Sequence, residues 1–304
     1  MLLADGHGVV GIDNMNDSYD VRMKQHRLRS LKDQKEFTFH EIDISDRKIV
    51  DKFEGESFDA VINLAARAGV RDSVQDPWVY VDANMTGTLN MLEIARRNGV
   101  PKFVFASTSS VYGANAPLPT PEGAESDRPL QPYAATKKGA EALCHAYHFL
   151  HGLDVTVVVY FTVYGPAGRP NMSMFRFVQS IFEDKPIQLF GDGEQTRGFT
   201  YIDDIARGTI QALKPVGYEV VNLGGHESIS INKLISIFES AIGKKAIVER
   251  KPLDKADMLA SWADVTHAGE LLGWEPNVGL EEGVRRLVAW YKAERSWASQ
   301  IKTD

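Results

Sequence analysis

Hydrophobic and polar positions along the first part of the chain alternate between two patterns. Short apolar or β-branched runs are typical of buried strands, and longer runs with apolar residues three and four positions apart are typical of helices. We therefore expect an α/β fold in which a parallel sheet carries helices on both faces. The strand-like segments are 8–12, 37–44, 60–64, 103–107 and 155–161, and the helix-like segments are 22–31, 45–53, 79–98 and 133–150.

Such sheets bind ligands beyond the carboxyl ends of their strands. Functional residues are therefore expected directly after Ile12, Ile44, Leu64, Ser107 and Phe161. The pattern loosens after residue 165: a loop rich in glycine and proline spans 165–170, and a turn spans 191–194. Helices are predicted at 174–182, 230–242 and 281–292, which indicates a smaller, mixed C-terminal lobe.

Composition and charge narrow the classes of partner. The net charge of −7 argues against a general nucleic-acid or anionic-membrane surface. No apolar run is long enough to span a membrane, and the single cysteine, Cys144, cannot form an internal disulfide, which indicates a reducing compartment. His145, His148 and His151 lack acidic companions, so we predict no metal site there. We expect a cytoplasmic protein that binds neither nucleic acid nor a membrane.

The sharpest chemical signal is the sequence YAATK at 133–137, which opens a predicted helix. Residues four apart share a helix face, so the Lys137 ammonium is expected near the Tyr133 phenol, where it lowers the phenol pKa. The tyrosine then becomes an acid–base group near neutral pH. Upstream, the hydroxyl run 107–110 follows a predicted strand, where it can hydrogen-bond the same substrate oxygen. With the acidic Asp13 after an early strand, these residues indicate a short-chain dehydrogenase-type site.

The chain resembles an extended short-chain dehydrogenase/reductase, and within that family a nucleotide-sugar 4-epimerase. The resemblance implies a Rossmann-like doubly wound parallel sheet with NAD as cofactor, a UDP-sugar as substrate, and a homodimer with helices at 84–98 and 134–150 as interface candidates. It assigns 1–164 plus about 199–222 to an NAD-binding domain, and 165–198 and 223–304 to a nucleotide-sugar-binding lobe. The stretches that carry it are GIDNMND, IDISD, VINLAARAGVRDSV, FASTSSVYG, YAATKK, YFTVYGPAGRP, FTYIDDIARG and LLGWEP.

The same resemblance implies a role for each site residue. The catalytic residues are Thr108 through its hydroxyl, Tyr133 as base, and Lys137 as partner of Tyr133 and ligand of the nicotinamide ribose. The other cofactor-binding positions are Asp13 and Asn14 at the adenosine ribose, Asp43 and Ile44 at the adenine, Leu64, Ala65 and Ala66 at the pyrophosphate and nicotinamide side, Asn84 behind the active site, and Tyr160 and Val163 beside the nicotinamide. The substrate-binding positions are Ser109 and Ser110 in the sugar pocket, Thr162 and Arg169 at a C6 carboxylate, and Arg197 at the pyrophosphate.

The implied reaction is epimerisation at C4 of a UDP-sugar through a 4-keto intermediate: Tyr133 takes the proton of the 4-hydroxyl while hydride moves to NAD+, and the ketone takes hydride back on its other face. Related dehydratases carry an acidic pair at Ser109 and Ser110, and decarboxylating relatives carry a glutamate in that stretch, so epimerisation is favoured. The loop 160–170 resembles that of UDP-glucuronate 4-epimerases, which points to UDP-glucuronate and UDP-galacturonate. A UDP-glucose 4-epimerase, a decarboxylase and a catalytically impaired nucleotide-sugar-binding relic are the alternatives.

Several features depart from the family pattern. Val159 stands where relatives have arginine, and Gly198 replaces an acid after Arg197. In the region of 252–257, where some relatives carry a second phosphate-binding arginine, this chain has Asp254, and Lys251 or Lys255 is a possible substitute.

The family also begins with a strand, a G-x-x-G-x-x-G loop and a helix, and here the strand, the loop and most of the helix are absent. Either the start is an internal methionine of a longer gene, or the chain folds with a gap in the centre of its sheet. In the second case we expect weak NAD+ affinity, which an as-purified spectrum with stoichiometric nicotinamide would contradict.

Overall fold

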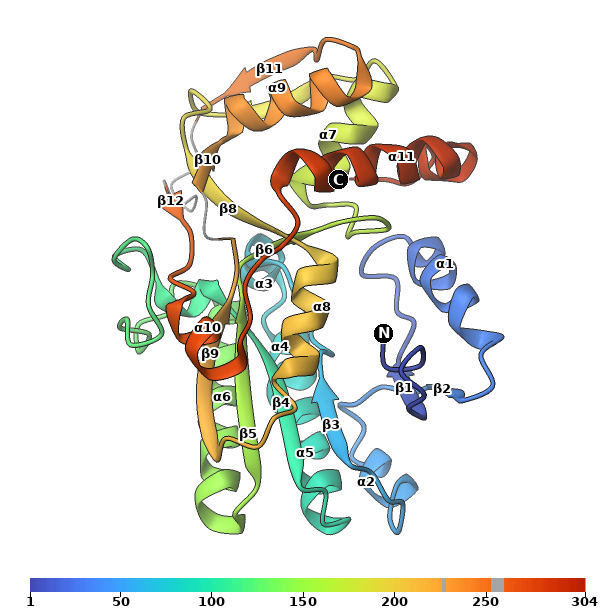
Figure 1. Ribbon diagram of the computed structural model, residues 1–304, viewed down its shortest axis with the longest axis vertical. Coiled ribbons are helices and arrows are strands. Elements are labelled where there is room, and N and C mark those ends of the chain that lie inside the picture. The colour runs from blue at the N-terminus through green and yellow to red at the C-terminus, as the bar shows by residue number, and fades with distance from the viewer. Residues whose placement is uncertain (226–227, 253–259, 304) are drawn as a thin grey trace.

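The computed structural model describes residues 1–225, 228–252 and 260–303. A parallel sheet with its helices forms the lower part of the molecule in Figure 1, and a smaller lobe lies above it. The main sheet has four parallel strands in the order β3-β4-β5-β9. These strands are β3 (Ala60–Asn63), β4 (Lys102–Thr108), β5 (Asp154–Tyr160) and β9 (Tyr218–Leu223).

Every residue of β4 is buried, as expected for a parallel strand covered on both faces. Phe103 and Phe105 pack on one face with the helices α5 (Gly87–Arg97) and α6 (Pro132–His151). Val104 and Ala106 pack on the other face with α8 (Ile202–Gln211) and α10 (Thr266–Leu272). The doubly wound parallel sheet predicted from the sequence is therefore confirmed.

The sheet is divided into two parts. Strands β1 (Val9–Asp13) and β2 (Phe37–Glu41) form a separate parallel pair, to the right of the main sheet in Figure 1. Among the described residues, β1 pairs with β2 alone, and β3 pairs with β4 alone. The parallel strands are thus divided between β1 and β3.

The predicted helix at 79–98 is interrupted. It consists of α4 (Trp78–Tyr80), a π-helical turn η1 (Val81–Thr86) and α5. A π-helical turn is rare and is found mostly at functional sites, and this one carries Asn84. The helix expected at 45–53 is shorter, α2 (Lys48–Lys52): the Asp43 carboxylate accepts from the Ser45 amide in the turn before it, and the Asp46 carboxylate accepts from the Lys48 amide at the helix start. Short helices α3 (Val70–Gln75) and η2 (Ser109–Tyr112) complete this part.

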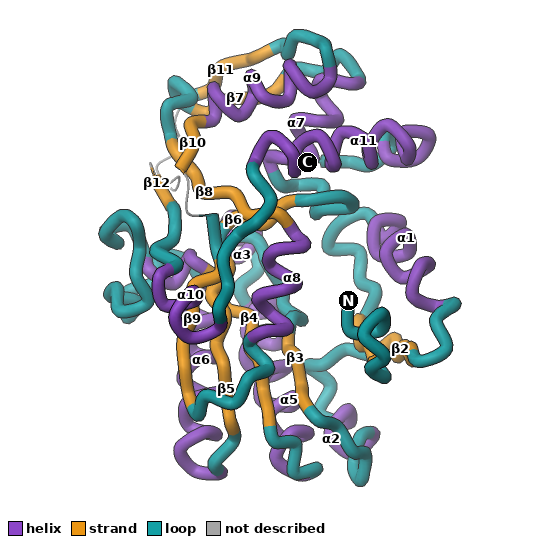
Figure 2. The backbone as a smooth tube through the Cα atoms, viewed as in Figure 1, coloured by secondary structure: helices purple, strands orange, loops and turns teal. Residues whose placement is uncertain are grey.

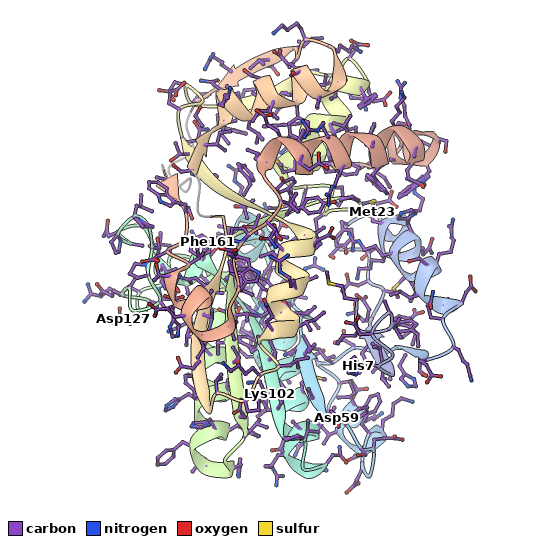
Figure 3. The ribbon with its side chains drawn as sticks, in the orientation of Figure 1. His7, Met23, Asp59, Lys102, Asp127 and Phe161 are labelled. Carbon is purple, nitrogen blue, oxygen red and sulfur yellow. The ribbon has the colours of Figure 1, made fainter. Side chains whose placement is uncertain are left out.

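The upper lobe is built around three helices, α7 (Ser173–Phe182), α9 (Ile231–Ile242) and α11 (Leu280–Ala298), whose apolar faces form one core. Helix α1 (Val21–Lys32) joins this core through Met23, which is fully buried and labelled in Figure 3. The lobe's strands are β6 (Thr162–Tyr164), β7 (Ile187–Phe190), β8 (Thr196–Tyr201), β10 (Ser228–Ser230), β11 (Val248–Lys251) and β12 (Ala260–Ser261).

Strand β8 pairs with β6, β10 and β12, and β7 pairs with β11. Figure 2 shows the strands of the main sheet side by side below this lobe. Phe161, which directly follows β5, lies between the sheet and the lobe in Figure 3. The carboxyl ends of the main strands thus face the lobe. In the described part of the chain, no helix is long and apolar enough to cross a membrane.

Candidate active site

A cavity of about 350 Å³ opens where the carboxyl ends of β1, β2, β3 and β4 converge. It brings together residues that are far apart in the sequence, as the strand-end rule predicts. Among the residues proposed from the sequence, it is lined by Asp13, Asn14, Asp43, Ile44, Leu64, Ala65, Ala66, Tyr133, Lys137, Tyr160 and Arg169.

One end of the cavity carries two carboxylates. The Oδ1 atom of Asp13 accepts hydrogen bonds from the Met15 amide at 2.7 Å and from Lys24 Nζ at 3.0 Å. Asn14 links the two strand ends, since its Nδ2 donates to Asp43 Oδ2 at 2.8 Å. Burial raises the pKa of the Asp43 carboxyl, but hydrogen bonds from Ser45 and Asn14 outweigh it and hold the pKa below its usual value. Both carboxylates are thus oriented to accept hydroxyl or amine donors.

Helix α5 fixes the backbone that follows β2. A Cβ atom on Gly87 would lie 2.7 Å from Cδ1 and Cγ1 of Ile44, so glycine allows this close approach. Asn90 Nδ2 donates to the Ile44 carbonyl at 2.8 Å. Asp43 and Ile44 are therefore held at the cavity wall by a helix rather than by a mobile loop.

Tyr133 lies at the other end of the cavity, in the first turn of α6. Its ring packs edge-on against Tyr80, with ring centroids 6.1 Å apart. Burial raises the pKa of the Tyr133 phenol, while a hydrogen bond with Thr108 and the charge of Arg169 act in the opposite direction. From the sequence we expected Lys137 to be the group that favours the phenolate. In the structure Thr108 and Arg169 are the groups that favour the phenolate, but burial outweighs both, so the pKa of Tyr133 lies above its ordinary value and the lowered pKa expected from the sequence is wrong.

Lys137 lies one turn further along α6 and is 2 % exposed. Its Nζ lies 4.1 Å from the centroid of the Phe105 ring, and its side chain lines the cavity. Burial lowers the pKa of the Lys137 ammonium to about 8, against the influence of Cys144 and Glu141, which favour the charged form. An ammonium of this kind changes charge close to neutral pH, a property that often marks functional sites.

Asn84 does not line the cavity but supports its wall. It is fully buried, and its amide exchanges two hydrogen bonds with the backbone of Arg67, at 2.8 and 3.0 Å. Its Nδ2 also donates to Thr136 Oγ1 at 3.0 Å. The π-helical turn thus ties the loop after β3 to the start of α6, which carries Tyr133. Direct cofactor contact by Asn84 stays a prediction.

Six other proposed residues lie outside the cavity lining. Thr108 caps η2, where its Oγ1 accepts from the Ser110 amide at 3.3 Å. Arg197 lies on β8 and donates to the Thr196 carbonyl at 2.8 Å. Of the remaining four, two are half-buried in η2 and two are half-buried in β6: Ser109, Ser110, Thr162 and Val163.

Two departures from the family pattern have packing reasons. A Cβ atom on Gly198 would lie 2.6 Å from the Gly225 carbonyl oxygen, so the acidic side chain of relatives has no room here. Val159 is 1 % exposed between β4 and β9, where an apolar side chain completes the core. Asp254 and Lys255 lie outside the described residues, and Lys251 pairs with Glu249 at 3.1 Å.

The sequence analysis gave no role to Lys24 or Arg67, two cationic residues that line the cavity. Arg67 lies in the loop that follows the carboxyl end of β3, so the strand-end rule was the signal that could have found it. Lys24 carried no such signal. It lies within a helix, and its contact with Asp13 arises only through the packing of α1.

A second, larger cavity of about 800 Å³ lies in the upper lobe, between α7, β7 and the C-terminal residues. Arg71, Arg176, Lys185 and Lys302 give it a cationic lining, and the buried Oδ1 of Asn171 faces no hydrogen-bond partner among the described residues. The two cavities adjoin along the chain: Ala68 and Arg169 line the smaller one, and Arg71 and Asn171 line the larger one.

The smaller cavity fits a dinucleotide at its two ends. Asp13 and Asp43 offer acceptors for ribose hydroxyls and an adenine amine, and Lys137 offers a donor near Tyr133. The cationic side chains on the described wall are Lys24, which bonds Asp13, together with Arg67 and Arg169, and they suit phosphate oxygens.

Comparison with known proteins agrees with this geometry. A model of the NAD-dependent epimerase/dehydratase family matches residues 1–224. The UDP-glucuronate 4-epimerase of Thermodesulfobacterium geofontis is 56 % identical over 303 residues, which are 99 % of this chain and 94 % of that protein.

Two solved structures are similar over nearly their whole length. The Bacillus cereus UDP-glucuronic acid 4-epimerase, in complex with UDP-glucuronic acid and NAD, is 37 % identical with a TM-score of 0.88, covering 96 % of this chain and 93 % of that one. The Thermotoga maritima UDP-glucose 4-epimerase, with UDP-glucose, is 31 % identical with a TM-score of 0.89, covering 97 % and 94 %. The chain therefore belongs to the NAD-dependent epimerase/dehydratase family, and it is an extended short-chain dehydrogenase/reductase of the nucleotide-sugar epimerase group whose cofactor is NAD.

Proposed function

We propose that the protein interconverts UDP-glucuronate and UDP-galacturonate by NAD-dependent epimerisation at C4. The similarity to the Thermodesulfobacterium geofontis and Bacillus cereus enzymes supports this proposal. So does the cavity itself, in which a phenol, a buried ammonium and a free guanidinium nitrogen converge.

Tyr133 is the proposed base. Its Oη accepts the proton of the sugar 4-hydroxyl, and the Thr108 hydroxyl and the charge of Arg169 offset part of the burial that raises its pKa. Lys137 donates to the nicotinamide ribose from the cavity wall, and Thr108 hydrogen-bonds the reacting oxygen. NAD+, when bound, supplies the acceptor and then the donor of the hydride. Tyr133 then returns its proton to the same oxygen, so the sugar undergoes no net oxidation.

Arg169 carries the choice of a uronate over a neutral hexose. Its Nη2 donates to the Ala68 carbonyl at 3.1 Å, and its guanidinium lies 5.9 Å from the Tyr19 ring centroid. Its Nε is buried and has no partner among the described residues. A buried guanidinium N–H without an acceptor is costly, and a C6 carboxylate at the Tyr133 end of the cavity removes that cost. This free donor is the observation that carries the proposal.

The nucleotide part of the substrate is proposed to occupy the larger cavity. Its volume of about 800 Å³ and its cationic lining suit a nucleoside diphosphate, and it adjoins the sugar end at Arg71 and Asn171. The binding of the substrate pyrophosphate by Arg197, expected from the sequence, stays a prediction because this residue lines neither cavity.

The substrate assay separates the candidate functions. The protein is incubated with UDP-glucuronate or UDP-glucose, each with and without added NAD+, and the products are separated by chromatography. We expect UDP-galacturonate from the first substrate and at most slow turnover of the second. UDP-glucose as the better substrate would favour the UDP-glucose 4-epimerase. Binding of UDP-sugars without turnover, with NAD+ in excess, would favour the non-catalytic relic.

The Arg169→Met variant tests the carboxylate contact. A charge-assisted hydrogen bond in a desolvated site contributes about 2–3 kcal/mol, so the ratio of kcat/KM for UDP-glucuronate over UDP-glucose should fall roughly 100-fold. UDP-glucose serves as the internal control, because it lacks the carboxylate. An equal loss for both substrates would refute the carboxylate contact and leave Arg169 with its effect on Tyr133 alone.

A homodimer is proposed for the outer face of α5 and α6. Apolar side chains on and beside these helices are solvent-exposed in the single chain, among them Leu89, Phe149 and Leu150. Leu89→Glu should convert the dimer to a monomer in light scattering at micromolar concentration. The control is Leu130→Glu, at another exposed leucine outside these helices. A wild-type monomer would refute the proposal.

The cytoplasm is the proposed compartment. Cys144 is buried and unpaired, which suits a reducing environment. Localisation of a fluorescent fusion to another compartment would refute this.

A further inference from the structure

A buried carboxylate on α6 has no role in the reaction proposed above. Glu141 is 4 % exposed. Its Oε1 accepts a hydrogen bond from Ser107 Oγ at the end of β4, and its Oε2 accepts from Lys138 Nζ at 2.8 Å. A buried carboxylate is costly unless it is paired and hydrogen-bonded, so its presence behind a cavity wall calls for a reason.

Its position relates it to the cavity. Lys137 and Glu141 are four residues apart on α6 and share one helix face. That face packs on β4, where Phe105 lies under the Lys137 ammonium and Ser107 bonds Glu141. Lys137 and Ser107 both line the cavity. Glu141 therefore stands directly behind two wall residues and contacts one of them.

The charge of Glu141 acts on Lys137. Cys144 and Glu141 are the groups whose negative charge favours the ammonium form against burial. Burial raises the pKa of the Cys144 thiol to about 12, so this thiol is neutral near pH 7. Glu141 is then the anion that remains to stabilise the Lys137 ammonium.

We propose that Glu141 is a positioning residue of the active site: its buried carboxylate keeps Lys137 charged at the cavity wall and couples that lysine, through Ser107, to the strand end that presents Thr108. The role in catalysis rests on the proposed epimerase function, whereas the coupling between the two side chains does not. Without this carboxylate, Lys137 loses its proton at a lower pH, and with it the charge proposed to bind the cofactor ribose.

The surroundings of Glu141 define what else can respond to its removal. The titratable groups that face it are Lys137, Lys138 and Cys144 on α6, Tyr112 on η2 and Tyr218 on β9. The neutral hydroxyl of Ser107 faces it from β4. Burial and the charge of Glu141 raise the pKa of both tyrosines above the neutral range, so they stay protonated in the experiment.

The test follows the titration of Lys137 in the full chain. Protein labelled with [13C]lysine is titrated from pH 6 to 11, and the 13Cε resonance that is missing in Lys137→Met reports the midpoint. Glu141→Gln keeps an acceptor for Ser107 but removes the charge, and should lower the midpoint by about one pH unit. Lys138→Met removes the cation that pairs with Glu141, and should raise the Lys137 midpoint. Ser107→Ala removes the hydrogen bond but keeps the charge, and should leave it within about 0.3 unit.

The pH midpoint of the alkaline limb of the kcat–pH profile, measured with NAD+ added, should shift in each variant in the same direction as the Lys137 midpoint from NMR. A midpoint that is unchanged in both Glu141→Gln and Lys138→Met overturns the proposal, and Lys138→Met decides alone if Glu141→Gln does not fold. A shifted midpoint with an unshifted alkaline limb overturns the catalytic role and leaves an electrostatic pair. Absence of turnover in the wild type overturns the epimerase function, while the NMR midpoints still decide the coupling.

Discussion

Replacing Lys137 by methionine should stabilise the protein while removing its activity. Burial lowers the pKa of Lys137 from 10.5 to about 8, a difference of about 2.5 units. At 1.36 kcal/mol per unit, the charged form costs about 3 kcal/mol in the folded state at pH 7. Methionine fills a similar volume without that charge, although it loses the contact with the Phe105 ring. We expect a net gain of about 1–3 kcal/mol.

The pH dependence of the gain identifies its origin. The folded-state pKa of Lys137 is depressed, so between pH 8 and 10.5 the unfolded chain binds more protons than the folded one. The stability of the wild type therefore rises through this window relative to the variant. Urea unfolding of both proteins at pH 7 and at pH 10 should show the advantage of Lys137→Met shrinking to about 1 kcal/mol or less at the higher pH.

A matched control is available in the next residue. Lys138 is 39 % exposed and forms an ion pair with Glu141 at 2.8 Å. Lys138→Met should lower the stability or leave it unchanged, because this cation is solvated. The reasoning is refuted if Lys137→Met is less stable than the wild type at pH 7, or if its advantage does not change with pH.

Three further predictions concern stability away from Tyr133. Gly87→Ala should cost about 1 kcal/mol in urea unfolding and weaken NAD+ binding in calorimetry, because the new Cβ would lie 2.7 Å from Ile44 side-chain atoms; unchanged affinity would contradict the role of α5 at the cavity. Asp154→Asn should cost about 3 kcal/mol of unfolding free energy, because it breaks a buried ion pair with Lys102, which Figure 3 labels at the amino end of β4. Turnover at saturating substrate should persist, and its loss would contradict a purely structural role for this pair. A hydrogen bond from Arg96 lowers the pKa of Glu93 to about 2, so Glu93→Gln should cost about 2 kcal/mol of unfolding free energy at pH 7. This cost should fade as the pH falls from 4.5 towards 2 in acid titrations. A cost that stays constant over this range would show that it does not come from the Glu93 charge.

Most of the main sheet and of the cavity lining could be predicted from the sequence. Parallel strands buried on both faces give continuous apolar runs, and β4 and β5 were therefore visible as strands. Because parallel strands end on the same side, Asp13, Asp43 and Leu64 could be expected together, and all three line the cavity. The strands of the upper lobe were not predicted, since short segments such as β6 and β12 depend on pairing with β8 rather than on their own pattern.

Local residue pattern by itself determined the alternation of strands and helices and the YAATK helix start, because each depends on neighbours in the chain. Tertiary packing alone decided the electrostatics of the site. Arg169 reaches the surroundings of Tyr133, Lys24 reaches Asp13, and Glu141 reaches Ser107 across elements that the sequence separates. Charge interactions depend on distance and burial, and neither can be read from residue spacing along the chain.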